Sequence, residues 1–278
     1  MSSENGTKAK QDFVYANKIK TKIMLEKASQ DNAYVTEKRY LYGYDNEELV
    51  SKRSFVDVFI LLFKGELPTR EEANLLEKLM IGLINPGPRH PAVKASMVAG
   101  VSKANIEHLL PIGLSVLGGE SNGAKEVLLA MKFIKKNVSN STTEVVKSIR
   151  VESSDEGDFH PFPGFGSCYG GRDIYSNNLI VQLLEQTDID NSAGYLRWAN
   201  QLSQELKKSN MGVLTTGLAA AVFLEIGIPN REAVGLFQII CAPGVFTQGA
   251  EQTHLPITAM PMLDDEQYIF DPTIKKAE

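Results

Sequence analysis

The sequence predicts an all-α protein with one large helical domain and a second, smaller helical lobe. From Ser54 onward, apolar residues recur every three to four positions in nearly every long segment, as on an amphipathic helix. Glycine and proline separate these segments, and strand-like pieces are short and lie around residues 34–41. A chain of 278 residues is also long enough to bury a large core.

Clear start and stop signals bound the first predicted helices. Ser54 can cap a helix that ends near Gly65, because serine satisfies free amides at a helix start and glycine favours a helix end. Residues 68–69 (Pro-Thr) open the next helix, which carries two glutamates in its first turn. This helix stops at residues 85–88 (Asn-Pro-Gly-Pro), a strong breaker run. Further helices are expected from Pro91, over 104–117 and over 123–137.

The second half of the chain alternates between helices and one loop. Residues 160–171 are dense in glycine, proline and aromatic residues and predict a loop. The segment 213–226 is almost wholly apolar, which is typical of a helix buried on every side. A helix from Asn230 is expected to end near Cys241, because residues 243–244 (Pro-Gly) break it before another short helix. Two more helices are expected near residues 173–185 and 191–208.

Composition and charge exclude several classes of function. The net charge is −5 and lysine and arginine are not clustered, so we expect no nucleic-acid partner. The nearly uncharged stretch 212–223 is too short to span a bilayer, so we expect no membrane partner. Residues 1–10 have no apolar core like that of a secretory signal, and we expect a cytoplasmic protein. Two cysteines and four histidines lack the spacing of a metal site, so no metal is expected.

Several sequence blocks resemble the citrate synthase family, and in particular its short citryl-CoA lyase-like members. The most specific blocks are residues 42–45 (Tyr-Gly-Tyr-Asp), 54–58 (Ser-Phe-Val-Asp-Val) and 62–69 (Leu-Phe-Lys-Gly-Glu-Leu-Pro-Thr). Similar pieces follow in the family's order at residues 117–119, 123–124, 163–166, 217–229 and 243–252. The resemblance covers about residues 15–265.

The resemblance implies a two-domain helical fold with its active site in the cleft between a large domain and a small mobile lobe. It places the large domain at residues 1–124 and 223–278 and the small domain at residues 125–222. It also implies a reaction that forms or breaks a C–C bond between an acyl-CoA and a 2-oxo acid. The family is dimeric, and we expect a homodimer that buries the apolar helices 73–84, 92–101 and 213–226.

The same resemblance implies that the catalytic residues of the family are replaced. The positions of its two catalytic histidines, its catalytic aspartate and its carboxylate-binding groups no longer hold those groups. These positions fall at Pro86, Asn122, Ser167, Tyr175, Val213, Cys241 and Met260. Loss of a general base or of an oxyanion donor typically costs about 10²–10⁴-fold in rate. We therefore expect the chain to be inactive as a citrate synthase.

Four residues are candidates for a replacement catalytic set. Asn122 could donate a hydrogen bond to an enol or carbonyl oxygen, or it could only cap the helix that follows. Ser167 and Cys168 lie in the motif nearest to the chemistry of the family. The Cys168 thiol could be a nucleophile if a base or a helix terminus lowers its pKa, and His160 could be that base. The alternative for Cys168 is a buried small apolar residue.

Other residues are candidates for binding. In the family, the backbone of the turn Pro163, Gly164, Phe165 and Gly166 lies against coenzyme A; here it could instead be a tight turn between lobes. Arg172 could contact a phosphate of coenzyme A, or it could be a solvated loop residue. His90 lies at a predicted helix start. It could face the substrate, or it could be a surface residue at that helix start. The replaced positions Tyr175, Val213, Cys241 and Met260 complete the expected substrate-binding set.

Two hypotheses about function follow. In the first, the protein is a repurposed enzyme that binds an acyl-CoA or a related small molecule and forms or breaks a C–C bond with non-family residues. Its substrate would carry fewer carboxylates than citrate, because the carboxylate-binding groups are replaced. In the second, the protein is a pseudoenzyme that serves as a dimeric binding or regulatory partner. No tightly bound cofactor is expected, and coenzyme A or an acyl-CoA would be a substrate.

Overall fold

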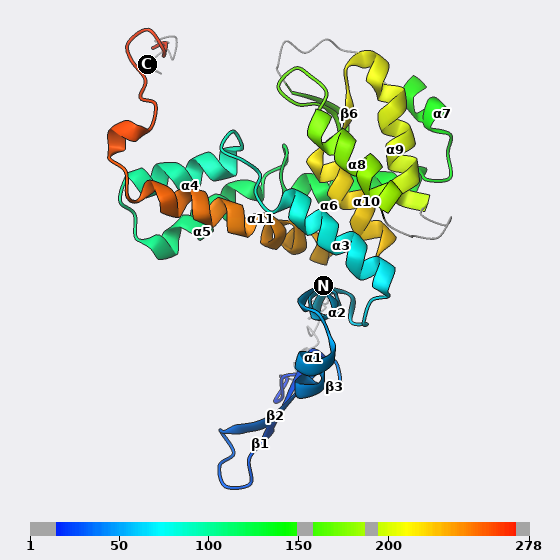
Figure 1. Cartoon of the computed structure of the whole chain (residues 1–278), viewed down its shortest axis with the longest axis vertical. Coiled ribbons are helices and arrows are strands. Elements are labelled where there is room, and N and C mark those ends of the chain that lie inside the picture. The colour runs from blue at the N-terminus through cyan, green and yellow to red at the C-terminus, as the bar shows by residue number, and fades with distance from the viewer. Residues whose placement is uncertain (1–14, 149–157, 187–193, 271–278) are drawn as a thin grey trace, which may run out of the picture. The chain divides into compact units, whose positions relative to one another are not determined.

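The computed structural model describes residues 15–148, 158–186 and 194–270. The chain divides into two compact units, Met1–Ser54 and Phe55–Glu278. The cartoon in Figure 1 shows these units, coloured from blue at the N-terminus to red at the C-terminus. The division expected from the resemblance, with boundaries at residues 124 and 222, is a different one and stays a prediction.

The first unit is a small antiparallel sheet followed by a short helix. Strands β1 (Met24–Ala28), β2 (Thr36–Leu41) and β3 (Tyr44–Asp45) lie in the order β1-β2-β3. The tight turn between β2 and β3 has positive φ at Tyr42 (49°) and Gly43 (90°), which suits the right-handed twist of a hairpin. Asp45 caps α1 (Asn46–Lys52) by accepting a hydrogen bond from the Glu47 amide. The strand expected around residues 34–41 is therefore confirmed as β2.

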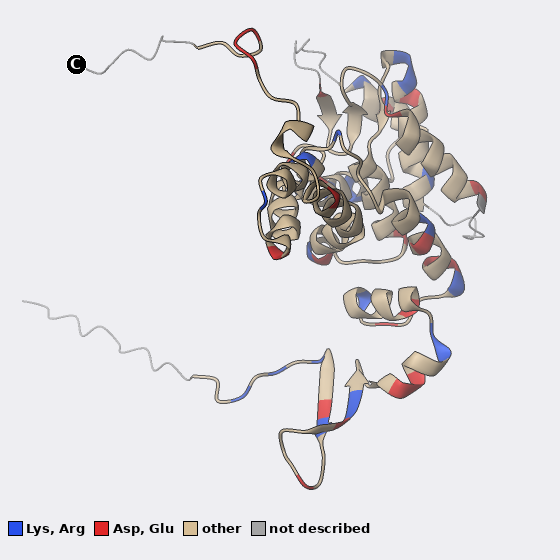
Figure 2. Cartoon of the chain, turned by 60° about the vertical axis from the view of Figure 1, so that its left-hand side comes forward, with Lys and Arg blue, Asp and Glu red and all other residues tan. Residues whose placement is uncertain are grey.

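The hairpin carries charged residues along its strands, which Figure 2 shows in blue and red. Arg39 and Glu26 form an ion pair across β1 and β2 at 3.1 Å. Both side chains are more than half exposed, so the pair contributes little stability.

The second unit is built from helices whose boundaries largely follow the sequence signals. Gly65 has a positive φ of 83° and ends the first of these helices, as expected. Thr69 and Glu72 form a capping box at the start of the next helix. The helices are α2 (Phe55–Lys64), α3 (Arg70–Leu83), α4 (Pro91–Val101), α5 (Ile106–Leu117), α6 (Ala124–Asn137), α7 (Thr142–Lys147), α8 (Ile174–Gln186), α9 (Gly194–Leu206), α10 (Thr215–Glu225) and α11 (Asn230–Gln252).

Helix α10 lies in the centre of the hydrophobic core. Every residue from 216 to 224 is buried, as the apolar run predicted. The helix packs against α6, α9 and α3 (Figure 1). Its apolar surface is therefore used inside one chain, and the expectation that the segment 213–226 contributes to a dimer interface is wrong.

A second small sheet lies where the sequence predicted only a loop and a helix start. Strands β4 (Phe159–Phe162), β5 (Phe165–Ser167) and β6 (Gly212–Val213) are antiparallel in the order β4-β5-β6. Gly164, with φ of 77°, makes the turn between β4 and β5 possible. The all-α prediction is therefore correct only for most of the chain: the fold is mostly helical, with two small sheets.

Helix α11 runs unbroken through the residues that were expected to end it. Pro243 has no amide proton to donate inside the helix. The Gly244 amide instead donates to the carbonyl oxygen of Ile84, beyond the end of α3, at 3.0 Å. A Cβ atom on Gly244 would lie 2.4 Å from the Cα of Asn85, so only glycine permits this contact. Residues 243–244 (Pro-Gly) therefore lie inside α11, where the glycine allows close contact with the end of α3, and they do not end the helix.

By length and composition, α11 is long and apolar enough to cross a membrane. The membrane expectation from the sequence considered only the stretch 212–223 and did not take this helix into account. Its central residues 233–250 carry no charge. The helix also packs against α4, α5 and α6, and nine of its residues are buried there or elsewhere in the chain. A core helix of this length has the same composition.

Candidate functional site

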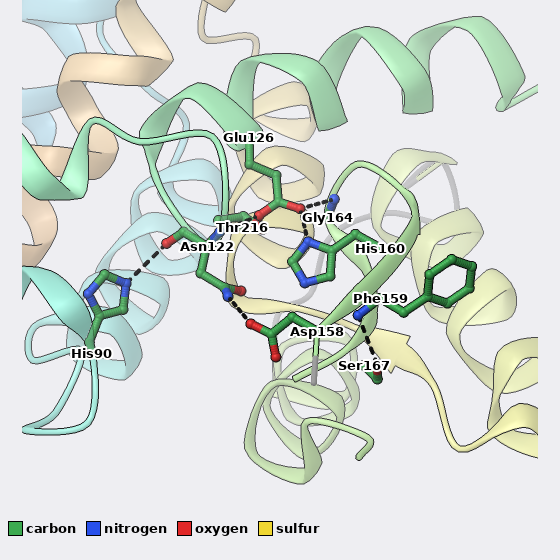
Figure 3. A network of polar contacts seen from close by, with 9 residues as sticks. All are labelled: His90, Asn122, Glu126, Asp158, Phe159, His160, Gly164, Ser167 and Thr216. Carbon is green, nitrogen blue, oxygen red and sulfur yellow. Dashed lines mark hydrogen bonds and ion pairs between the residues drawn. The ribbon is translucent and has the colours of Figure 1, made fainter. Parts of the chain in front are cut away.

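A buried carboxylate, that of Glu126, is the centre of the candidate site. Glu126 is the third residue of α6, and its side chain is only 4% exposed. Oε1 accepts hydrogen bonds from His160 Nδ1 at 2.7 Å and from the Gly164 amide at 3.0 Å. Oε2 accepts from the Asn122 amide at 2.9 Å and from Thr216 Oγ1 at 3.0 Å (Figure 3). Four donors, from the loop before α6, from β4, from the turn between β4 and β5 and from α10, thus converge on one carboxylate of α6.

Glu126 and His160 form an ion pair. Burial alone would raise the pKa of Glu126, but the hydrogen bond and charge of His160, helped by Gly164 and Thr216, hold this pKa below its usual value. Burial alone would likewise lower the pKa of His160, but the hydrogen bond and charge of Glu126 raise it, with a smaller effect of Asp158. The carboxylate is therefore ionised, and the imidazole is held closer to its protonated form than an exposed histidine would be.

The other ring nitrogen of His160, Nε2, is the one that the bond to Glu126 leaves available for proton transfer. Nε2 is buried and has no hydrogen bond of acceptable geometry within the described part of the chain, although the Ser167 carbonyl lies near enough to favour its proton. In Figure 3, Nε2 lies on the ring edge that faces away from Glu126, on the side of Asp158. The site therefore presents one proton-transfer atom whose ring is oriented by a carboxylate.

Asn122 connects the site to the loop before α4. Its backbone is left-handed, with φ of 54°. Its carbonyl accepts a hydrogen bond from His90 Nε2 at 3.1 Å, and its amide Nδ2 donates to Asp158 at 3.2 Å. Gly123, rather than Asn122, is the cap residue of α6. The capping role considered for Asn122 is therefore wrong, because its side chain binds Asp158.

His90 lies at the start of α4, as expected, but it is half-buried in this network. Its Nδ1 accepts a hydrogen bond from the Ala92 amide at 3.1 Å, so the proton of a neutral ring is on Nε2. Burial lowers the pKa of His90, with a partial opposing effect of the Asn122 carbonyl. His90 is therefore a neutral donor that holds the backbone of Asn122 in place.

The turn between β4 and β5 is packed tightly against the rest of the protein. A Cβ atom on Gly164 would lie 2.5 Å from the Cα of Gly217, and one on Gly166 would lie 2.1 Å from the Phe159 carbonyl oxygen. Phe165 is fully buried. In this structure the glycines are required by packing against α10 and β4, which favours the tight-turn interpretation of residues 163–166.

Cys168 does not meet the condition for a nucleophile. Burial, together with the carboxylates of Asp158, Asp173 and Glu126, raises its pKa to about 11. A nucleophilic thiol needs a lowered pKa. The neighbouring Ser167 accepts a hydrogen bond from the Phe159 amide at 3.2 Å and so helps to close β4 on β5.

Two of the expected substrate-binding residues lie in the hydrophobic core. Val213 is 0% exposed and Cys241 is 2% exposed, so in this structure neither side chain has surface for a ligand. Burial raises the pKa of Cys241 to about 12. Arg172 donates to Asn177 Oδ1 at 2.6 Å, which ties the start of α8 to β6, because Asn177 also bonds the Val213 carbonyl.

The other expected binding residues lie on other parts of the second unit. Tyr175 is 59% exposed and donates to the carbonyl of Gly82 in α3 at 2.8 Å. Met260 is half-buried and ends the short 3₁₀ helix η2 (Ile257–Ala259). The structure thus brings together Asn122, His160 and His90 from the predicted set.

Three residues of the site were missed by sequence reasoning, although two of them carried a signal. Glu126 lies one and two helical turns before Ala130 and Ile134, which places a charge among the buried residues of α6. Thr216 is a polar residue inside the apolar run of α10. A buried carboxylate and a buried hydroxyl in adjacent helices are typical of a polar network. Asp158 carried no comparable signal.

Comparisons with known proteins identify the fold. No protein-family model matches the chain, and no curated protein matches it either. Citryl-CoA lyase from Hydrogenobacter thermophilus is similar in structure, with a TM-score of 0.71 and 22% identity over 94% of this chain and 96% of that chain. ATP citrate lyase from Methanosaeta concilii, solved with (3S)-citryl-CoA, has a TM-score of 0.67 and 15% identity over 91% of this chain and 43% of that chain.

A third structure extends the likeness to a synthase. Citrate synthase from Thermoplasma acidophilum, solved with carboxymethyl coenzyme A and oxaloacetate, has a TM-score of 0.54 and 15% identity over 81% of this chain and 57% of that chain. At such identities the likeness is one of fold. The chain therefore has a citrate synthase-like fold, which it shares with citryl-CoA lyase.

Proposed function

We propose that the protein binds a coenzyme A thioester and forms or breaks a C–C bond, with His160 as its acid–base group and Glu126 as the residue that positions it. The observation that carries the proposal is the buried Glu126–His160 ion pair beside the turn 163–166. The solved proteins that share the fold include complexes with citryl-CoA and with carboxymethyl coenzyme A, which supports a thioester as ligand.

The geometry supports a mechanism in which one atom, Nε2 of His160, both accepts and returns the proton. In the cleavage direction, Nε2 of neutral His160 takes the proton of a β-hydroxyl group on the acyl-CoA. The electrons of the C–C bond move to the thioester as an enolate, and a carbonyl compound leaves. Nε2 then returns the proton to the α-carbon, so that no oxidant or further reactant is needed. Glu126 accepts from Nδ1 throughout, which keeps the exchangeable proton on Nε2.

The charges around the site support a substrate with few carboxylates. Glu126, Asp158 and Asp173 all act on the Cys168 thiol, so three acidic groups lie near this part of the chain. Two of the nearby cations are already engaged: His160 is paired with Glu126, and Arg172 is bonded to Asn177. A tricarboxylate such as citrate would be repelled here. The substrate that we propose is an acyl-CoA whose carbonyl partner carries at most one carboxylate.

The first test measures binding and the absence of citrate synthase activity together. We expect coenzyme A and short acyl-CoAs to raise the melting temperature in a saturable manner. Incubation with acetyl-CoA and oxaloacetate should release no coenzyme A above background, and Ser167→His alone should not change this. Failure of every thioester to bind would refute the proposal. Citrate synthase turnover by the wild type would show that the family's catalytic positions were assigned wrongly.

The alternative is a catalytically inactive binding or regulatory partner. The burial of Val213 and Cys241, at two positions where the family has ionised groups, favours it. Binding of thioesters without turnover or proton exchange would support this alternative.

A homodimer is proposed for either function. Helices α4 and α5 expose apolar side chains: Val98 is 49%, Ile106 54% and Val116 42% exposed. Such a group of exposed apolar residues is typical of a protein interface. We expect sedimentation at micromolar concentration to show a dimer, and the double variant Val98→Glu/Val116→Glu to be monomeric. Val50→Glu, at a 79% exposed valine in α1, is the matched control and should remain dimeric. A monomeric wild type would refute the proposal.

A further inference from the structure

We infer that Tyr169 is a gate over the candidate site, held shut by hydrogen bonds at both its backbone and its hydroxyl group. The need for a gate follows from the burial of His160. Its side chain is 15% exposed, and its Nε2 atom is inaccessible to solvent. A molecule can therefore reach this nitrogen only if some part of the surrounding chain moves.

Tyr169 lies at the tip of a tight turn in an unusual backbone conformation. Cys168 and Gly171 pair across the turn, with amide–carbonyl bonds of 2.7 and 3.1 Å in the two directions. Tyr169 and Gly170 between them both have positive φ, at 51° and 75°. Glycine, asparagine or aspartate usually occupies the first of these positions, and a bulky residue there is strained. The tyrosine must therefore be held by its contacts.

Two contacts hold Tyr169. Its amide donates to Asp158 Oδ1 at 2.5 Å, and its hydroxyl group donates to the carbonyl of Arg89 at 3.2 Å. The hydroxyl bond joins residues 80 positions apart in the sequence, although the tyrosine side chain is 68% exposed. An exposed aromatic ring that reaches across to another segment makes a contact that solvent can replace at little cost.

These contacts close a ring of hydrogen bonds beside His160. Asp158 Oδ2 accepts from Asn122, and the Asn122 carbonyl accepts from His90, as Figure 3 shows. His90 follows Arg89 directly, and Arg89 accepts from Tyr169, which completes the ring at Asp158. Tyr169 joins the ring through an exposed side chain, which can leave while the backbone contacts of Asn122 with Glu126 and His90 persist.

Cys168 reports the state of this gate without any substrate. It precedes Tyr169 and is half-buried, whereas Cys241 is buried in the core and serves as an internal reference. We expect Tyr169→Phe to label at Cys168 with a small maleimide about 2–10-fold faster than the wild type, the range expected for loss of one hydrogen bond. Tyr169→Phe leaves unchanged the three carboxylates that raise the pKa of Cys168. Hydrogen exchange of the amides of residues 159–167 should increase in parallel.

Tyr175→Phe is the matched control. Its hydroxyl group also donates to a carbonyl, at 2.8 Å, and its side chain is similarly exposed, but it lies outside the ring. We expect it to leave the labelling of Cys168 unchanged. Equal labelling of Cys168 in Tyr169→Phe and in the wild type would overturn the gate. Faster labelling of Cys241 as well as Cys168 would also overturn it, because general loosening of the fold would then explain the result. These readouts need no thioester, so they stand apart from the proposed function.

Discussion

Replacing His160 with asparagine is expected to lower the rate of α-proton exchange on a bound acyl-CoA by about 10²–10⁴-fold, the usual effect of removing a general base. The amide nitrogen of asparagine can take the place of Nδ1 and donate to Glu126, so the packing of the site should survive. The atom that is lost is Nε2, the one that exchanges the proton. This variant therefore separates proton transfer from the structural role of the ion pair.

The measurement follows loss of the α-proton signal of acetyl-CoA or another short acyl-CoA in D₂O by NMR, which needs no carbonyl partner. In the wild type the rate should rise with pH through the pKa of His160, because the neutral ring is the base and Glu126 raises that pKa. Thioester binding should be unchanged in the variant. His254→Asn, at an exposed histidine after α11, is the matched control and should exchange like the wild type. Exchange by His160→Asn at the wild-type rate would remove His160 from the mechanism.

The second large effect is expected on stability. Glu126→Ala leaves a buried imidazole without its counter-ion and leaves the donors of Asn122, Gly164 and Thr216 without their acceptor. Breaking a buried ion pair by removing one partner typically costs about 3–5 kcal/mol of unfolding free energy. Glu120→Ala, in the exposed loop before the same helix, is the control and should cost less than about 1 kcal/mol. Urea denaturation measures both, and equal midpoints for the two variants would contradict the central role of Glu126.

The pH dependence of stability gives the same test without removing the side chain. The pKa of His160 is raised above its usual 6.5, so the contribution of its protonation to stability is fully present below pH 6.5 and is lost as the pH rises through the folded-state pKa. The pKa of Glu126 is lowered below its usual 4.5, so its contribution is present above pH 4.5 and is lost at lower pH. The melting temperature should therefore fall above pH 6.5. Glu126→Gln should weaken that decline, because it removes the charge that raises the pKa of His160.

Long, strongly periodic elements could be predicted from sequence. The capping box of α3, the end of α2 at Gly65 and the burial of α10 follow from local signals that tertiary structure did not override. The strands β4–β6 are two to four residues long, too short for an alternating pattern to show. The helix end expected at Pro243 does not occur. The next residue, Gly244, donates its amide to the carbonyl of Ile84, which lies 160 residues earlier in the chain, and local sequence signals do not reveal such a contact.

The candidate site was predicted in part for a related reason. His160 and Asn122 were singled out because they lie in or near motifs, but their partners come from other segments. Glu126 and His160 are 34 residues apart, and Glu126 and Thr216 are 90 apart. The proposed role of Cys168 depended on its electrostatic surroundings, which the sequence order does not reveal. Burial and, after it, the carboxylates of Asp158, Asp173 and Glu126 raise this pKa, the direction opposite to that needed.

The contact between α11 and the end of α3 has a consequence for biosynthesis. A ribosome releases the chain from the N-terminus, so α3, α4, α5 and α6 emerge long before α11 exists. Until then Ile84 lacks its donor from Gly244, and α4, α5 and α6 lack the helix that packs against all three. The surfaces of α4, α5 and α6 that α11 covers therefore stay exposed until α11 has been synthesised. We therefore expect nascent chains of this protein to expose apolar helix surface until α11 has been synthesised.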